Sequence, residues 1–203
     1  GAYLIQGKDV VINGPEALAE VKSKTGKEVT AESAKQNTIA FYAPSKTFNL
    51  AGMHSASVLI KDPVLRHKVW RGINTDEVGE PNFFAIDVAI AAYNESEDWV
   101  NECNSYIYQN KCYVIDYCKK NMPQVKPLVS PATYILWIDI SGVTLNDVKF
   151  ADYLKEKTGL VLNPGSKYGT NGKGFLRMNV ATQKSRVEDA MSRLEDAIKS
   201  YKD

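Results

Sequence analysis

The stretch Thr133-Tyr-Ile-Leu-Trp-Ile-Asp-Ile140 predicts a strand in the C-terminal part of the chain. Its β-branched and aromatic residues are typical of a strand. We expect a helix over 146–158 that is closed by Gly159, and then a short strand over 160–162. Another strand is expected over 174–180. This alternation predicts an α+β (α/β) lobe in which helices pack on a small sheet.

The final helix is expected to begin at Ser185-Arg-Val-Glu188, because this spacing is typical of a capping box. Its apolar residues recur with a period close to that of an α-helix. The predicted buried face consists of Val187, Ala190, Met191, Leu194, Ala197, Ile198 and Tyr201.

The middle of the chain adds two strands and two helices. Buried strands are predicted over 38–42 and 56–60, separated by a turn region with proline and glycine. Apolar residues at helical spacing predict a helix over 85–93. A longer helix follows Ser96 and ends at Asn121-Met-Pro123. Its length suggests a helix that connects two lobes.

Composition limits the classes of partner. The chain has 203 residues, 44% of them hydrophobic, with 25 Lys+Arg, 24 Asp+Glu and a formal net charge of +1. This balance argues against nucleic acid and against an anionic membrane as partners. No apolar run approaches the roughly 20 residues that span a bilayer, and we see no signal-peptide pattern. A cytoplasmic globular protein of one domain or two small ones is expected.

The cysteines and histidines do not predict a metal site. Cys103, Cys112 and Cys118 fall in one predicted helix and lack CxxC spacing. Their odd number argues for reduced thiols in a reducing compartment. His54 and His67 form no HExxH pattern with one another. Thus we expect no metal.

Lys46 is the first candidate for chemistry. It follows a predicted strand, lies between the hydroxyls of Ser45 and Thr47, and precedes Gly52. A lysine in a partly buried turn can become a nucleophile toward a carbonyl, because burial lowers its pKa. Neighbouring hydroxyls and backbone amides can hold a phosphate. An ordinary exposed loop lysine is the alternative.

Arg177 is the second candidate, because it occupies an alternating position in an otherwise apolar strand. Burying an arginine there is unfavourable unless the guanidinium is paired. Either an internal carboxylate or a substrate acid would satisfy it. The segment 165–174 lacks phosphate-loop and dinucleotide-binding spacing, so it is interpreted as a flexible loop near a site.

These segments resemble a known family in both content and order. Ala43-Pro-Ser-Lys-Thr-Phe-Asn-Leu-Ala-Gly52 resembles the cofactor-lysine segment of fold-type I pyridoxal-phosphate enzymes. The similarity is greatest to the cystathionine β-lyase (C–S lyase) branch of the class I/II aminotransferases and covers roughly 38–203. It continues through Pro81-Asn-Phe-Phe84, Ala91-Ala-Tyr93, Pro131-Ala-Thr-Tyr-Ile-Leu-Trp137, Leu162-Asn-Pro-Gly165, Tyr168-Gly169 and Gly174-Phe-Leu-Arg-Met-Asn-Val-Ala181.

The resemblance implies a role for each candidate residue. Lys46 would be the Schiff-base lysine, which forms an internal aldimine with pyridoxal 5'-phosphate and then moves the substrate Cα proton. Ser45 and His54 would contact the cofactor, and Arg177 would bind the substrate α-carboxylate. The substrate would be a cystathionine- or cysteine-type amino acid, with β-elimination or transamination as the reaction. A homodimer or other self-association is implied as well.

Some positions depart from the family pattern. Ala43 stands where members often carry serine, and His54 stands where they often carry arginine. Both changes weaken the phosphate site, and both favour the lyase branch, which is looser there. Only 45 residues precede Lys46, and Asp9 is a stray candidate for the aspartate that pairs with the cofactor ring.

Two explanations follow for the N-terminal region. The chain is a truncated, engineered or degraded piece of such an enzyme, or residues 1–37 are a divergent replacement in a catalytically inactive remnant that acts through self-association or a partner. The expected segments are 1–37 (divergent or truncated, with strands at 3–5 and 10–12 and a helix at 15–22), 38–80 (large-domain remnant with the lysine), 81–122 (interdomain helices) and 123–203 (small C-terminal domain).

Overall fold

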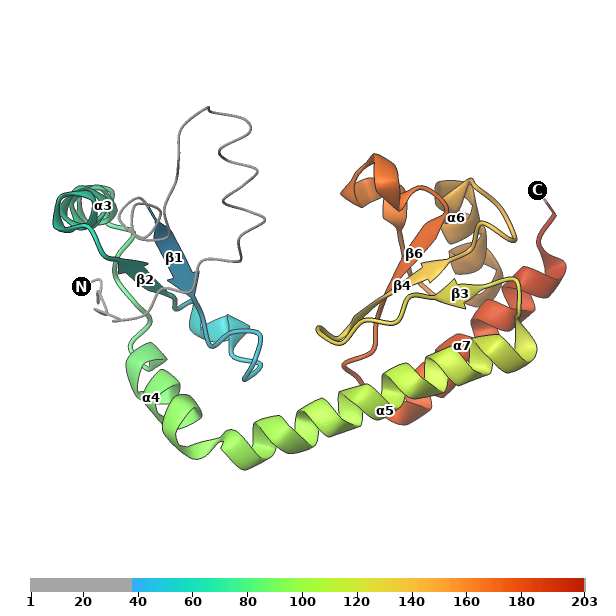
Figure 1. Cartoon of the computed structure of the whole chain (residues 1–203), viewed down its shortest axis with the longest axis horizontal. Coiled ribbons are helices and arrows are strands. Elements are labelled where there is room, and N and C mark those ends of the chain that lie inside the picture. The colour runs from blue at the N-terminus through green and yellow to red at the C-terminus, as the bar shows by residue number, and fades with distance from the viewer. Residues whose placement is uncertain (1–37, 203) are drawn as a thin grey trace, which may run out of the picture. The chain divides into compact units, whose positions relative to one another are not determined.

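The computed structural model describes residues 38–202. The chain divides into two compact units, residues 1–100 and 101–203, and each is described by itself (Figure 1). The strands and the helix expected within residues 1–37, together with Asp9, lie outside the described residues.

The N-terminal unit contains a two-stranded antiparallel ribbon. Strand β1 (Ile39–Tyr42) pairs with β2 (Ser57–Ile60), so that Ile39 faces Ile60. Both predicted strands exist, but β1 is not buried as expected, since Phe41 is 71% exposed. The reason lies in the packing: helix α3 contacts β2, where Leu59 and Ile60 are buried.

Helix α3 (Pro63–Thr75) was not predicted from the sequence. Its start carries two standard signals. The Asp62 carboxylate accepts a hydrogen bond from the backbone N–H of Leu65 at 2.6 Å, and Pro63 occupies the first turn. The Arg66 guanidinium donates to the Ile60 carbonyl at 3.1 Å, which ties the helix to β2.

Helices α4 (Ala85–Glu95) and α5 (Glu97–Asn121) confirm the two predicted helices. Glu97 and Asp98 lie in the first turn of α5, and Lys119 and Lys120 lie in its last turn. These charges complement the helix dipole at both ends. Residues of α5 fall in both units.

The C-terminal unit holds a four-stranded antiparallel sheet in the order β3-β4-β6-β5. The central pair aligns Trp137 with Arg177, and β5 aligns Asn163 with Arg177. The strand expected over 160–162 is wrong, because Leu160 and Leu162 pack against the core and pairing begins only at residue 163. The strands are β3 (Lys126–Pro127), β4 (Ile135–Asp139), β5 (Asn163–Pro164) and β6 (Phe175–Asn179).

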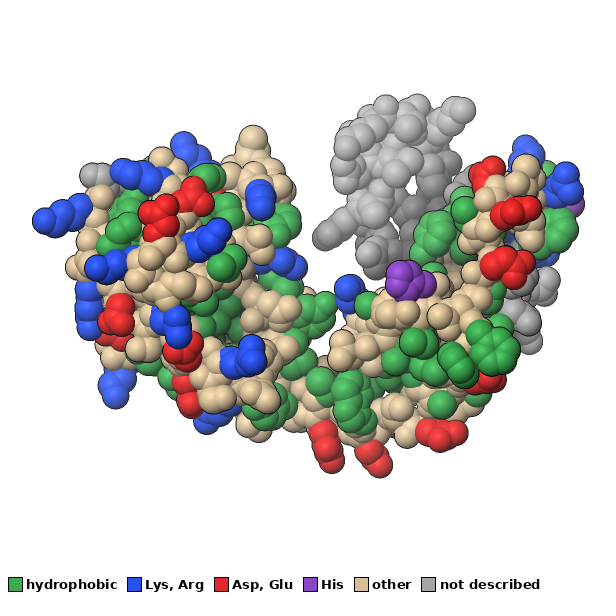
Figure 2. Space-filling view, turned by 180° about the vertical axis from the view of Figure 1, so that it is seen from behind, with side chains coloured by type: hydrophobic (Ala, Val, Ile, Leu, Met, Phe, Trp, Pro, Cys, Tyr) green, Lys and Arg blue, Asp and Glu red, His purple; other side chains and the backbone are tan. Residues whose placement is uncertain are grey.

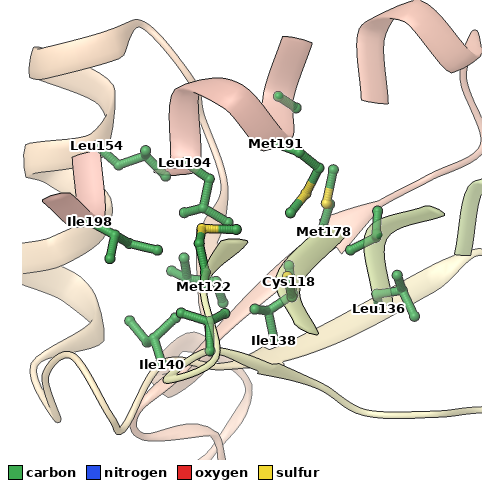
Figure 3. Packing of buried hydrophobic residues seen from close by; sticks show 14 of the residues in the cluster. Cys118, Met122, Leu136, Ile138, Ile140, Leu154, Met178, Met191, Leu194 and Ile198 are labelled. Atoms are coloured by element: carbon green, nitrogen blue, oxygen red, sulfur yellow. The ribbon is translucent and has the colours of Figure 1, made fainter. Parts of the chain in front are cut away.

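Helices cover one face of this sheet. Helix α6 (Asp147–Thr158) has the Asn146 side chain as its N-cap and Gly159, with φ 73°, at its C-terminus, as predicted. Helix α7 (Lys184–Ser200) buries the predicted stripe except Tyr201, which follows the helix and packs on Phe150. In Figure 3 the apolar side chains of helices and strands converge, including Met122, Ile138, Met191 and Leu194.

The capping box expected at Ser185 is wrong. Helix α7 begins at Lys184, and the N-cap residue Gln183 makes no side-chain capping bond. Instead, the Tyr106 hydroxyl of α5 accepts the backbone N–H of Lys184 at 2.8 Å. A tertiary contact therefore satisfies one of the backbone donors at the start of α7.

The surface agrees with the near-neutral composition. Figure 2 shows acidic and basic side chains interspersed over the C-terminal unit. Within residues 38–202, no helix has the length and apolar character needed to cross a membrane.

Candidate functional site

Lys46 lies at the centre of a tight turn between β1 and β2. Pro44 is buried at the start of this turn, and its carbonyl accepts the N–H of Phe48 at 3.0 Å. The carbonyl of Ser45 accepts the N–H of Leu50 at 3.0 Å. These bonds fold the backbone back on itself and leave the Lys46 side chain exposed rather than partly buried.

An aromatic contact joins the turn to helix α4, and a residue in the left-handed conformation ends the segment that follows the turn. The Phe48 ring meets Tyr93 of α4 edge to face at 5.1 Å. A short 3₁₀ helix, η1 (Ala51–Met53), follows and ends at His54, which has φ 52°. His54 is exposed, whereas Ser45 is half-buried.

Ser55 is a residue that sequence reasoning missed. Its hydroxyl oxygen is buried and has no hydrogen-bond partner among the residues that the structure describes. A buried hydroxyl without a partner is unfavourable, so this position has unused capacity to bind a polar group. A serine next to the expected phosphate-side residue His54 was the available signal.

Arg177 lies in the C-terminal unit, on the face of the sheet opposite the buried core. Along β6 the burial alternates, with Leu176 and Met178 buried and Arg177 between them half-buried. Trp137 and Asn163 are its neighbours on the adjacent strands. Directly opposed residues of antiparallel strands project to the same face.

Tyr168 contacts the Arg177 guanidinium in two ways. The Nη1 group donates to the Tyr168 hydroxyl at 3.3 Å, and the guanidinium carbon lies 5.3 Å from the ring centroid. Trp137 in turn packs edge to face on Tyr168 at 5.5 Å. The sequence placed Tyr168 in a matching motif but gave it no role, because its distance to Arg177 depends on the fold of an intervening loop.

The ion pair considered for Arg177 is not observed. Among residues 38–202, no carboxylate lies within salt-bridge distance of its guanidinium. Of the two alternatives left by the sequence, an internal acid partner therefore gains no support from this part of the chain. The guanidinium is stacked on an aromatic ring, and no described residue accepts a hydrogen bond from its Nε or Nη2.

The loop between β5 and β6, which was expected to be flexible, is tied to a buried carboxylate by hydrogen bonds. It contains two 3₁₀ helices, η2 (Gly165–Tyr168) and η3 (Thr170–Gly172). The buried Asp147 carboxylate accepts from the Ser166 N–H and hydroxyl at 2.8 and 2.5 Å, and from the Gly174 N–H at 3.3 Å.

These hydrogen bonds also shift the pKa of the Asp147 carboxyl. Burial by itself would raise the pKa of the Asp147 carboxyl, but the hydrogen bonds from Ser166 and Gly174 outweigh that effect and lower the pKa below its ordinary value. A charged acceptor therefore holds the loop.

Helix α5 holds one end of the central strand pair, where β6 ends and the segment that leads into β4 lies beside it. The buried Asn110 amide donates to the carbonyls of Val180 and Thr182, both at 2.9 Å. The buried Lys111 ammonium donates to the carbonyls of Ser130 and Ala132, also at 2.9 Å. These adjacent polar residues were missed, because only the tertiary structure brings strand ends to this turn of the helix.

The predicted site residues thus fall into two groups. Ser45, Lys46 and His54 share the turn region of the N-terminal unit, and Arg177 lies in the C-terminal unit. Among the described residues, no group of three or more His, Cys, Asp or Glu side chains is placed to hold a metal ion.

Comparison with known proteins supplies the family. A family model described as aminotransferase class I and II matches residues 11–194. Cystathionine beta-lyase PatB of Bacillus subtilis (strain 168) is 32% identical over 156 residues, which is 77% of this chain and 40% of PatB. Protein MalY of Escherichia coli (strain K12) is 26% identical over 159 residues, which is 78% of this chain and 41% of MalY.

A solved structure agrees. The crystal structure of cystalysin from Treponema denticola, which contains a pyridoxal 5'-phosphate cofactor, matches with a TM-score of 0.77 at 28% identity. The match covers 85% of this chain and 43% of cystalysin. The chain spans 40% to 43% of the length of these three relatives. The resemblance inferred from the motifs is confirmed, and the chain belongs to the class I and II aminotransferase family.

Proposed function

We propose that the chain belongs to a pyridoxal-phosphate-dependent aminotransferase or C–S β-lyase that acts on cystathionine- or cysteine-type amino acids. Residues 38–80 contribute the cofactor lysine, and residues 123–203 contribute the carboxylate-binding arginine. The kinship with a cystathionine beta-lyase and with a structure that contains the cofactor supports this proposal. The free thiols of Cys103, Cys112 and Cys118 support a reducing, cytoplasmic location.

One observation carries the proposal: Arg177 is half-buried on the uncovered sheet face and stacked on Tyr168, and no described residue pairs with it as an acid. A planar guanidinium in such a setting fits a carboxylate in two parallel hydrogen bonds. The α-carboxylate of an amino acid has this chemistry.

The residues of the Lys46 turn fit the cofactor. The Lys46 amine is exposed, so an aldehyde can reach it. The Ser55 hydroxyl, nine residues further along the chain, is buried without a described partner and has the chemistry to donate to a phosphate. Ser45 adds a second hydroxyl beside the lysine. We assign cofactor binding to Ser45, Lys46 and His54, with Ser55 as an addition.

Lys46 and Arg177 would have different roles in the proposed reaction. Bound pyridoxal phosphate supplies an electron sink for the bond broken at the substrate Cα. Lys46 Nζ would take up the Cα proton and deliver it to another atom, which in β-elimination is the departing sulfur, so that the substituent leaves as a thiol. Arg177 holds the α-carboxylate and so fixes the orientation of the Cα–H bond. In β-elimination the sulfur substituent leaves, and the remaining fragment hydrolyses to pyruvate and ammonia.

Covalent labelling tests the cofactor lysine. The chain is incubated with pyridoxal phosphate, reduced with borohydride and mapped by peptide mass spectrometry. We expect the pyridoxyl label on Lys46, its loss in Lys46→Ala and its retention in Lys68→Ala, a matched exposed lysine of the same unit. Pyruvate release from cystathionine that requires Lys46 would extend the result to activity. Equal labelling of many lysines would overturn the proposal.

A second candidate function is an inactive remnant that acts through self-association, for example as a homodimer. Large apolar side chains in the N-terminal unit favour it, since Phe41 is 71% exposed, Val78 72% and Phe83 87%. Exposed apolar patches often mark interfaces. Analytical ultracentrifugation that compares the oligomeric state of the wild type with that of Phe83→Ser tests this candidate. A wild type that is monomeric at all concentrations would exclude self-association. Labelling at Lys46 separates the two candidates.

A further inference from the structure

The orientation of Arg177 needs a physical cause. An arginine side chain loses rotamer entropy when it is held in one geometry. Arg177 is half-buried, and among residues 38–202 its hydrogen-bond partner is Tyr168. The residue that fixes this guanidinium therefore decides how well it binds an acid.

Tyr168 engages a particular part of the guanidinium. Its hydroxyl accepts from Nη1 at 3.3 Å, while the ring lies beneath the central carbon at 5.3 Å. A guanidinium has five N–H donors and binds a carboxylate in parallel along one edge. With Nη1 engaged, the edge formed by Nε and Nη2 is left for a ligand, and no described residue accepts a hydrogen bond from either atom.

Tyr168 itself is held from two sides. The Trp137 ring packs edge to face against it at 5.5 Å. Behind it, the buried Asp147 carboxylate binds Ser166 at one end of the loop and Gly174 at the other.

The loop also closes on itself through two glycines. A Cβ on Gly165 would lie 2.1 Å from the Gly172 carbonyl oxygen, and a Cβ on Gly172 would lie 2.0 Å from the Gly165 carbonyl oxygen. Neither position tolerates a side chain without backbone movement. The loop is therefore closed at its base, and Tyr168 projects from it.

We infer that Tyr168 is a positioning residue, which the Asp147-bound loop fixes beneath Arg177 so that the Nε/Nη2 edge of the guanidinium faces an incoming carboxylate. This inference rests on the proposed function for the identity of the ligand as an amino-acid carboxylate. The positioning itself is a property of the unliganded chain.

Nuclear magnetic resonance of the Arg177 side chain provides the test. The Nε–Hε signal is assigned by its loss in Arg177→Lys, and its mobility and solvent exchange are measured without ligand. L-Alanine is then titrated as the carboxylate probe. The variants are Tyr168→Phe, which keeps the ring, and Tyr168→Leu, which removes ring and hydroxyl. Tyr153→Phe is the control, because it removes another hydrogen-bonded hydroxyl in the same unit.

We expect Nε–Hε exchange to rise in Tyr168→Leu, to rise less in Tyr168→Phe and to stay unchanged in Tyr153→Phe. The L-alanine dissociation constant should increase roughly three- to tenfold in Tyr168→Leu, which is the effect of losing about one net hydrogen bond. Ser166→Ala, which removes one loop bond and keeps the carboxylate, should give a smaller change in the same direction. Circular dichroism confirms that each variant is folded.

The outcomes separate this inference from the proposed function. Unchanged Arg177 exchange in folded Tyr168→Leu would overturn the inference, whatever L-alanine does. Changed exchange without L-alanine binding to the wild type would support positioning and overturn the carboxylate role of Arg177. Binding through Nη1 alone, with no shift of Nε–Hε, would overturn the assignment of the edge.

Discussion

Strands β1 and β4 have similar apolar sequences but very different surroundings. In β4, Leu136 is 1% exposed and Ile138 is fully buried, because helices α5, α6 and α7 supply side chains to the same cluster. In β1, Phe41 is 71% exposed and Tyr42 50%. Burial, and with it the free energy of unfolding that each side chain contributes, depends on what packs over a strand.

The comparison predicts that the two units respond very differently to substitution. In the C-terminal unit, truncating a core residue removes buried area and leaves a cavity. In the β1–β2 ribbon, truncating a side chain of β1 changes little that is buried.

The largest effect is expected from Leu194→Ala, at a fully buried position in α7. The loss of unfolding free energy should be about 2–5 kcal/mol, because the cavity adds to the lost transfer free energy. This loss of unfolding free energy is measured by urea denaturation, with hydrogen exchange of the β4 amides as the readout that reports on the C-terminal unit. A loss of unfolding free energy smaller than that of an exposed α7 variant such as Lys199→Ala would contradict the predicted difference between the two units.

The next effect is expected from Asp147→Asn and depends on pH. Because the folded-state pKa of Asp147 is below its ordinary value, ionised Asp147 stabilises the fold above the unfolded-state pKa. The stabilisation is lost as pH falls through the lowered folded-state pKa. We expect the variant to lose about 1–3 kcal/mol at neutral pH.

Unfolding free energies of both proteins across an acid series check this sign. The difference between wild type and Asp147→Asn should shrink as the wild-type carboxyl becomes protonated. A difference that stays constant down to the lowest pH would show that the carboxylate charge does not hold the loop.

A smaller effect is expected from Lys111→Met. The variant keeps the apolar stem but removes two hydrogen bonds to the carbonyls of Ser130 and Ala132. A loss of about 1 kcal/mol is expected, because water reaches these partly exposed acceptors. Thermal unfolding compares it with Lys119→Met, an exposed lysine on the same helix. Equal midpoints would show that the buried ammonium is dispensable.

The smallest effect is expected from Phe41→Ser in β1. Surface substitutions away from packed features usually change stability by about 0.5 kcal/mol or less. Chemical denaturation of the variant should therefore resemble that of the wild type. A loss comparable to that of Leu194→Ala would show that β1 is covered in solution, and it would favour the self-association candidate.

Much of the fold could be predicted from the sequence where local patterns agree with packing. Helix α6 has Asn146 and Gly159 at its ends, and α7 has an apolar stripe of helical period. Both were predicted because capping and periodicity act over a few residues. Helix α3 was missed although Asp62-Pro63 marks its start.

The site was predictable only in part. Family motifs identified Lys46 and Arg177 as candidates, whereas Tyr168, Asp147 and Ser55 received no role. Tyr168 and Asp147 make their contacts with residues that are distant in the sequence. The Ser55 hydroxyl is buried without a described partner. Neither property can be seen in a local sequence pattern.

The family, the helices with strong end signals and the near-neutral charge could all be inferred from the sequence. The exposure of β1, the contact of Tyr106 with the start of α7 and the stacking of Arg177 on Tyr168 became visible only in three dimensions. Propensity and capping act over a few residues, whereas burial and side-chain pairing depend on which elements meet.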